Sequence, residues 1–143
     1  MSPHQQLLDE CYVVAPRAPT GTMVLMRILI VDDSKVMRSA VTRAMRDTGI
    51  NFTVVEASDG KVALEMVRRE RPDVVLCDWN MPVMSGIELV RELRARGDKV
   101  VFGMVSARST LGSSEEALAA GADFFIAKPF ASTDFKTALE GRV

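Results

Sequence analysis

Short runs of consecutive apolar residues recur along the chain, separated by stretches in which apolar residues are spaced by three or four. The runs cover residues 28–31, 52–55, 74–77, 100–105 and 124–127. Runs of this length, apolar at successive positions and rich in β-branched residues, are typical of parallel strands buried on both faces. The pattern therefore predicts five buried strands.

The intervening stretches have the spacing and the end signals of helices. Apolar residues recur at helical intervals within residues 36–45, 63–67, 87–93, 117–120 and 135–139. Pairs such as Thr48-Gly49 and Ser85-Gly86 stand where these stretches stop or begin. Strands that alternate with helices predict an α/β fold with a doubly wound, five-stranded parallel sheet. Right-handed crossovers then place the carboxyl ends of all strands along one edge.

The first 25 residues differ from the alternating part that follows. Pro3, Pro16, Pro19 and Gly21 interrupt this stretch, and its apolar patch at residues 12–14 is too short for the core of a secretory signal. We expect residues 1–25 to be a flexible N-terminal extension and residues 26–143 to form one domain.

Polar side chains follow four of the five predicted strands. Asp32 and Asp33 follow the first strand, Asp78 the third, Ser106 the fourth and Lys128 the fifth. Each has a simple structural explanation, because Asp33 and Ser106 could cap a helix or turn and Lys128 could lie at the surface. Parallel pairing nevertheless brings these strand ends together, at the edge where such folds bind ligands. We therefore expect one shared site.

The three carboxylates of this site would repel one another. Two like charges about 5 Å apart repel by roughly 3 kcal/mol at an effective dielectric of about 20, so three pairs cost about 10 kcal/mol. Lys128 alone cannot cancel three negative charges, whereas Lys128 with a divalent cation can. Oxygen ligands favour a hard ion, and partial ligation completed by water favours Mg²⁺ over Ca²⁺. Beside such an ion, Asp78 is suited to attack phosphorus.

Composition narrows the classes of function. The formal net charge of −1 gives no general attraction to nucleic acid or anionic lipid, and no apolar stretch is long enough for membrane insertion. His4, the only histidine, lies in the N-terminal stretch, which excludes catalysis by a histidine of this chain. Cys11 and Cys77 form no metal or disulfide pattern, which favours a reducing, cytoplasmic location.

Several segments at the predicted strand ends match one family in order and approximate spacing. They are Asp32-Asp33, Asp78-Trp79-Asn80-Met81-Pro82 with Gly86, Ser106-Ala107 and Lys128-Pro129-Phe130. From about residue 27 to the C-terminus, the chain resembles a response-regulator receiver domain of the CheY-like, single-domain type. This resemblance implies a flavodoxin-like (βα)5 fold with strand order 2-1-3-4-5.

The resemblance also implies the roles of the acidic residues. Asp78 would accept a phosphoryl group from the phosphohistidine of a histidine kinase. Asp33, Asp78 and the backbone carbonyl of Asn80 would ligate Mg²⁺, with Asp32 acting mainly through water.

The remaining implied roles concern the response to phosphorylation. Lys128 would contact the phosphoryl oxygens, and the Lys128-Pro129 bond would be cis. Ser106 would turn towards the phosphoryl group while Phe125, the switch aromatic, swings inward. Trp79 is expected to be exposed and without a chemical role. Arg108 stands where sequences of this type often carry an acidic residue, which leaves the lifetime of the phosphorylated state open.

These roles predict a stand-alone response regulator of two-component, chemotaxis-type signalling. Its partners would be a histidine kinase or phosphotransfer protein and a downstream protein such as a flagellar motor switch, with no DNA and no membrane. A phosphorelay intermediate and a phosphorylation-independent, receiver-like scaffold are the alternatives. A phosphohydrolase of the haloacid dehalogenase type is disfavoured, because Asn80 stands where those enzymes place a second aspartate. We therefore expect no enzyme beyond self-phosphorylation and slow autodephosphorylation.

Overall fold

The computed structural model describes residues 13–14, 25–108 and 110–142. Its elements in chain order are β1 (Val13–Val14), β2 (Met26–Val31), α2 (Lys35–Arg46), β3 (Phe52–Ala57), α3 (Gly60–Glu70), β4 (Val74–Cys77), α4 (Gly86–Ala95), β5 (Val101–Ser106), α5 (Ser113–Ala120), β6 (Phe124–Ala127) and α6 (Ser132–Leu139). Four of the predicted apolar runs lie within strands β2, β3, β4 and β6, and the run at residues 100–105 overlaps β5 from Val101 onward. Among the described helices, none has the length and apolar character needed to cross a bilayer.

The sheet has six strands in the order β1-β3-β2-β4-β5-β6. Strands β2 to β6 pair in parallel, and counted from β2 their order is 2-1-3-4-5, which confirms the predicted fold. The sheet also contains a strand that was not predicted, β1, which pairs antiparallel with β3 at that edge of the sheet. Residues 13–14 of the expected flexible extension thus lie in the sheet, while residues 1–12 and 15–24 fall outside the described part of the chain.

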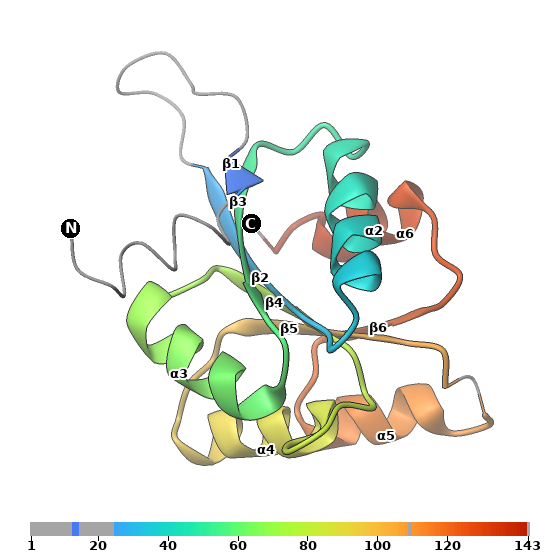
Figure 1. Cartoon of the computed structure of the whole chain (residues 1–143). Coiled ribbons are helices and arrows are strands. Elements are labelled where there is room, and N and C mark those ends of the chain that lie inside the picture. The colour runs from blue at the N-terminus through green and yellow to red at the C-terminus, as the bar shows by residue number, and fades with distance from the viewer. Residues whose placement is uncertain (1–12, 15–24, 109, 143) are drawn as a thin grey trace.

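Helices cover both faces of the sheet. Figure 1 shows α2 and α6 on one face and α3, α4 and α5 on the other. Ile28 and Ile30 of β2 belong to the apolar cluster under α2 and α6, whereas Leu29 and Val31 belong to the cluster under α3, α4 and α5. Because successive side chains of a strand point to opposite faces, a sheet covered on both faces needs apolar residues at every position. This explains the unbroken apolar runs in the sequence.

One strand position depends on glycine. Gly103 of β5 lies beside Phe124 of β6, and a Cβ built on Gly103 would collide with the Phe124 ring. The ring fills the space that a larger residue would need. Gly103 therefore makes this pair of strands closely packed rather than loose.

Candidate functional site

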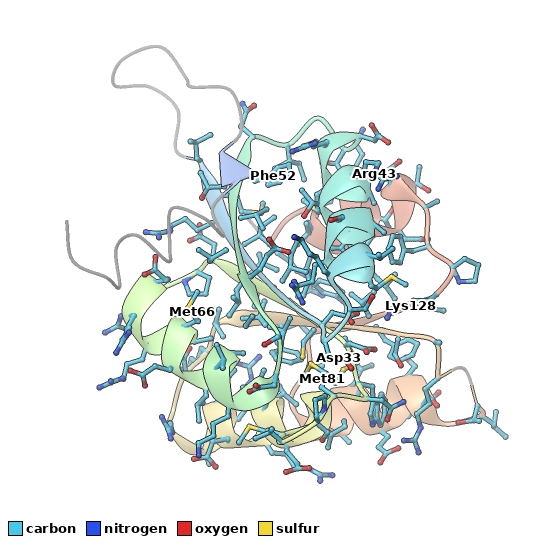
Figure 2. All side chains as sticks on the ribbon, viewed as in Figure 1. Asp33, Arg43, Phe52, Met66, Met81 and Lys128 are labelled. Carbon is cyan, nitrogen blue, oxygen red and sulfur yellow. The ribbon has the colours of Figure 1, made fainter. Side chains whose placement is uncertain are left out.

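The carboxyl ends of four strands meet at one edge of the sheet. The backbone amide of Asp78 donates to the Val31 carbonyl at 2.8 Å, and the amide of Lys128 donates to the Ser106 carbonyl at 2.9 Å. Pairing between neighbouring strands thus continues to the residues that carry the polar side chains. In Figure 2, Asp33 and Lys128 are labelled towards this edge, and Phe52, which begins β3, is labelled at the opposite end.

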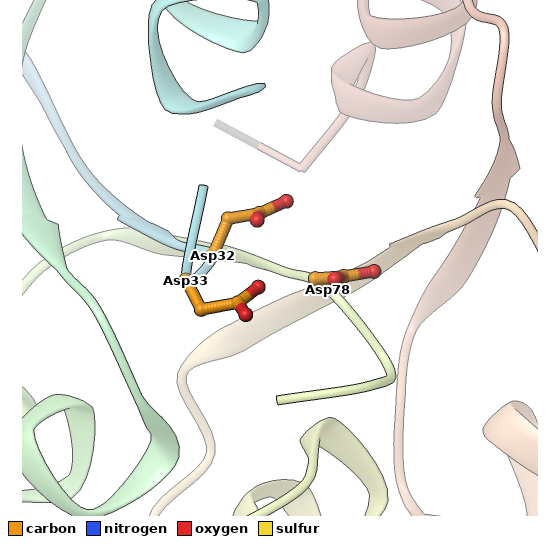
Figure 3. Close-up of side chains that lie close together, drawn as sticks. All are labelled: Asp32, Asp33 and Asp78. Carbon is orange, nitrogen blue, oxygen red and sulfur yellow. The ribbon is translucent and has the colours of Figure 1, made fainter. Parts of the chain in front are cut away.

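Three carboxylates gather at this edge. Asp32, Asp33 and Asp78 each offer one oxygen, and these oxygens all lie within 4.8 Å of one another. Figure 3 shows the carboxylates grouped around one space. Asp32 is buried, Asp78 is half-buried and Asp33 is exposed, so the group opens to solvent on the Asp33 side.

The turn from β2 to α2 sets the direction of the first two carboxylates. Ser34, rather than Asp33, caps α2, because its hydroxyl accepts a hydrogen bond from the Met37 amide at 3.2 Å. The Ser34 amide donates to Asp32 Oδ1 at 2.9 Å, which holds the Asp32 side chain in the crevice. Asp33 therefore has no capping role.

Lys128 is the cation of the crevice. Its Nζ lies 3.2 Å from Asp32 Oδ2 and 3.3 Å from Asp78 Oδ1, with 13% of the side chain exposed. The bond between Lys128 and Pro129 is cis, as the family resemblance implied. Among the described residues, Asp33 forms no ion pair, so three negative charges share one positive charge.

The pKa of Asp78 is raised, mainly because its carboxylate is buried. Burial raises the pKa of Asp78 above its ordinary value, the Lys128 ammonium opposes the rise, and the Asp32 carboxylate adds to it. The Trp79 amide, which donates to Asp78 Oδ1 at 2.9 Å, acts in the same direction as Lys128 and lowers the pKa. The crevice therefore holds its central carboxylate less favourably than water does.

The other predicted residues lie around this group rather than in it. Ser106 is buried at the end of β5, and its hydroxyl accepts a hydrogen bond from the Arg108 amide at 3.0 Å. Phe125 is half-buried in β6. Asn80 is exposed, two residues beyond Asp78 in the loop that leads to α4. The structure thus brings Asp32, Asp33, Asp78 and Lys128 into one group and places these three residues beside it.

Trp79 corrects the expectation that it is exposed. Its side chain is 4% exposed and belongs to the apolar cluster under α3, α4 and α5. The Phe125 ring meets it edge-on, with ring centroids 6.4 Å apart and planes at 74°. The Arg108 guanidinium lies over its face, 4.5 Å from the centroid. This stack was not predictable from a local pattern, because it joins two loops that are distant along the chain.

A second arginine, Arg38, holds the end of β2 that carries Asp32. Arg38 of α2 donates to the backbone carbonyl of Asp32 at 2.6 Å and pairs with Glu56 of β3 at 2.9 Å. This bond ties the strand end that carries Asp32 to the helix that follows. Sequence reasoning missed Arg38, since its only signal was an arginine one turn into a helix.

Comparison with known proteins identifies the class. Residues 28–140 match the response regulator receiver domain family, and the chain belongs to this family. It is 42% identical over 106 residues to the response regulator MprA of Mycobacterium leprae (strain TN), a match that covers 74% of this chain and 46% of that protein. It is 40% identical over 105 residues to MprA of Mycobacterium ulcerans (strain Agy99). The chain thus spans about half the length of the curated relatives it matches.

Solved structures agree with this assignment. The receiver domain of the response regulator NarL from Mycobacterium tuberculosis superposes with a TM-score of 0.73 at 30% identity, covering 82% of this chain and 95% of that one. The chemotaxis protein CheY4 of Vibrio cholerae gives a TM-score of 0.72 at 30% identity, covering 84% of this chain and 100% of that one. The chain therefore belongs to the receiver domains of the two-component response regulators.

Proposed function

We propose that this receiver domain accepts a phosphoryl group on Asp78 from the phosphohistidine of a histidine kinase or phosphotransfer protein. The observation that carries the proposal is the position of Asp78, half-buried between the Lys128 ammonium and two further carboxylates. A carboxylate in such a crevice is reachable by a phosphodonor and close to a cation that can stabilise phosphoryl oxygens.

The donor set fits Mg²⁺. Three carboxylates offer oxygens within 4.8 Å of one another, and among the described residues only the Lys128 ammonium forms an ion pair with them, which leaves a net negative charge for a cation to balance. Asp33, Asp78 and the backbone carbonyl of Asn80 would hold the ion, with Asp32 reaching it through water. A bound Mg²⁺ supplies charge stabilisation for phosphoryl transfer.

The hydrogen bonds of Asp78 indicate which of its oxygens reacts. Oδ1 accepts from the Trp79 amide at 2.9 Å and from Lys128 Nζ at 3.3 Å. Oδ2 is therefore the better nucleophile. It would form the new bond to phosphorus while the bond from phosphorus to the donor imidazole nitrogen breaks and the electron pair stays on that nitrogen. Lys128 Nζ would then move from the carboxylates onto a phosphoryl oxygen.

Phosphorylation would change the positions of the Ser106 and Phe125 side chains. The Ser106 hydroxyl would leave the Arg108 amide and turn towards the phosphoryl group, and Phe125 would move inward behind it. Such a change biases two arrangements of the loop after β5 and alters the surface formed by α5, β6 and α6. The domain would therefore act as a phosphorylation-dependent switch for protein partners.

The pathway is proposed on the likeness to a chemotaxis protein. CheY4 is matched over its whole length, which supports a chemotaxis-type regulator in the cytoplasm that acts on a protein such as a flagellar motor switch. A phosphorylation-independent, receiver-like scaffold is one alternative, and a phosphorelay intermediate is the other. Phosphoryl transfer onward from Asp78 to a histidine phosphotransfer protein would support that alternative.

The central test is incorporation of a phosphoryl group from acetyl phosphate or phosphoramidate in the presence of Mg²⁺, followed by intact mass spectrometry. The wild-type chain should gain the mass of one phosphoryl group, and Asp78→Asn should gain none. Asp47→Asn, which changes an exposed aspartate at the end of α2, is the matched control and should behave as the wild type. Labelling of folded Asp78→Asn at the wild-type level would refute the assignment.

A further inference from the structure

Arg108 is placed by an aromatic ring rather than by an acidic partner. Its guanidinium lies 4.5 Å from the centroid of Trp79, within the range of a cation–π contact. Glu116, the acidic group beside it, lies 3.9 Å from Arg108 Nη2, and both of these side chains are more than 40% exposed. An exposed pair at that distance contributes little. The stack on Trp79 is therefore the contact that sets the position of the side chain.

Trp79 connects this stack to the phosphorylation site. Its backbone amide donates to Asp78 Oδ1 at 2.9 Å, and its ring meets the edge of Phe125 at a centroid distance of 6.4 Å. One buried residue thus touches the acceptor carboxylate through its backbone and the switch aromatic through its side chain. Any change in the position of Trp79 reaches both.

The same arginine also holds Ser106. The Arg108 amide donates to Ser106 Oγ at 3.0 Å, so the start of the connection from β5 to α5 is fixed at two points. The first is this hydrogen bond, and the second is the stack of the Arg108 side chain on Trp79. A movement of the Ser106 hydroxyl towards Asp78 breaks the first contact, so the stack on Trp79 is then the contact that keeps Arg108 in its resting position.

We propose that Arg108 is a positioning residue that holds the connection from β5 to α5 in its resting arrangement through its stack on Trp79. Arg108 thereby sets how much phosphoryl binding is needed to switch the domain. This inference rests on the proposed function, because it requires an equilibrium that responds to phosphorylation.

The direction in which the affinity for a phosphoryl analogue changes distinguishes this proposal from one in which the Arg108 charge attracts the phosphoryl group. A contact made in the resting arrangement alone opposes switching by its own strength. Loss of a partly exposed cation–π contact should therefore tighten the binding of a phosphoryl analogue by about two- to fivefold. If Arg108 instead attracted the phosphoryl group by its charge, its loss would weaken binding.

Trp79 is the only tryptophan of the chain and reports on the stack directly. The experiment titrates beryllofluoride at saturating Mg²⁺ against wild type, Arg108→Ala, Arg108→Lys and Arg96→Ala, following Trp79 emission. Arg96→Ala is the matched control, because Arg96 is an exposed arginine that pairs with Glu92 on α4, outside this network. Acrylamide quenching of the free proteins measures access to the ring.

Arg108→Ala should raise acrylamide quenching of Trp79 and lower the Kd for beryllofluoride about two- to fivefold. Arg108→Lys, which returns a cation to the ring, should move both values back towards the wild type, and Arg96→Ala should change neither. An unchanged or higher Kd in Arg108→Ala overturns the inference while leaving the proposed function intact. A wild-type protein that does not bind beryllofluoride with Mg²⁺ overturns both.

A double-mutant cycle tests whether Arg108 acts through its contact with Trp79. In a Trp79→Leu background, followed by calorimetry, Arg108→Ala should no longer tighten beryllofluoride binding, because the ring that Arg108 stacks on is gone. The same tightening in both backgrounds would show that Arg108 acts by another route and would overturn the stack as its cause.

Discussion

The two ends of the sheet both carry charged side chains, and they balance the charge in different ways. At the carboxyl end, Asp32, Asp33 and Asp78 share the single ammonium of Lys128. The pKa of Asp78 is raised there, mainly because the carboxylate is buried. The negative charge at this end is not fully balanced, and a bound cation would reduce the repulsion and favour phosphoryl transfer.

At the amino end, carboxylates are matched by arginines and backbone amides. Glu70 accepts from Arg27 at 2.8 Å, and Asp123 accepts from Arg94 at 3.2 Å and from the Phe102 amide at 2.8 Å. These groups tie helix ends to strand starts. The difference indicates that charge at the amino end is paired in favour of stability, whereas charge at the carboxyl end is left available for the proposed chemistry at some cost in stability.

The largest predicted effect on stability comes from removing the Lys128 ammonium at the carboxyl end of the sheet. Lys128→Met should lower the free energy of unfolding by about 2–4 kcal/mol in EDTA, because three carboxylates then face one another without it. Millimolar Mg²⁺ should restore most of the loss. Urea unfolding with and without Mg²⁺ measures this, with Lys136→Met on the exposed face of α6 as control. A loss that Mg²⁺ leaves unchanged would contradict the account.

The matching change at the amino end is Asp123→Ala. It should cost about 2 kcal/mol, because it leaves the Arg94 guanidinium and the Phe102 amide without their acceptor. Beryllofluoride affinity should stay within about twofold of the wild type. Asp123→Asn, which keeps an oxygen for the amide, should cost less. A large drop in affinity in a folded Asp123→Ala protein would show that the two ends are not separate in function.

The smallest expected effect is an increase in the free energy of unfolding. Asp78→Asn should raise the free energy of unfolding at pH 7 by about 1 kcal/mol, because one of three like charges is removed while the shape is kept. The native pKa of Asp78 is raised, so the native state keeps this proton to a higher pH than the unfolded chain does. The stability of the wild type relative to Asp78→Asn therefore falls as pH rises through the native pKa.

Thermal unfolding of both proteins between pH 3 and pH 8 checks the sign. The gain should be absent below the unfolded pKa of about 3.9, where Asp78 is protonated in both states, and should grow to its full value at neutral pH. A variant less stable than the wild type at pH 7 would show that the Asp78 charge is well compensated, contrary to the account.

How much of this follows from the sequence can be seen residue by residue. The five parallel strands and the grouping of Asp32, Asp33, Asp78 and Lys128 were predictable, because apolar runs mark buried strands and parallel pairing aligns their ends. The cis bond before Pro129 followed from the family resemblance and was confirmed.

The rest depends on tertiary placement. The edge strand β1 has two residues in a proline-interrupted stretch, and its pairing with β3 has no periodic pattern to announce it. The direction of Trp79 depends on how the loop after β4 turns, and the stack with Arg108 joins two such loops. Contacts between irregular segments are set by the packed structure rather than by local preference, so the sequence indicated neither.

The most direct test of the central claim is a Mg²⁺ titration of Trp79 emission, since this ring is attached to the backbone that holds Asp78. The account predicts saturable binding in the wild type, and at least a tenfold weaker affinity in Asp33→Asn, which removes a carboxylate but leaves Asp78 and Trp79 in place. Equal affinity of Asp33→Asn and the wild type for Mg²⁺, or no response in either, would contradict a shared acidic metal site.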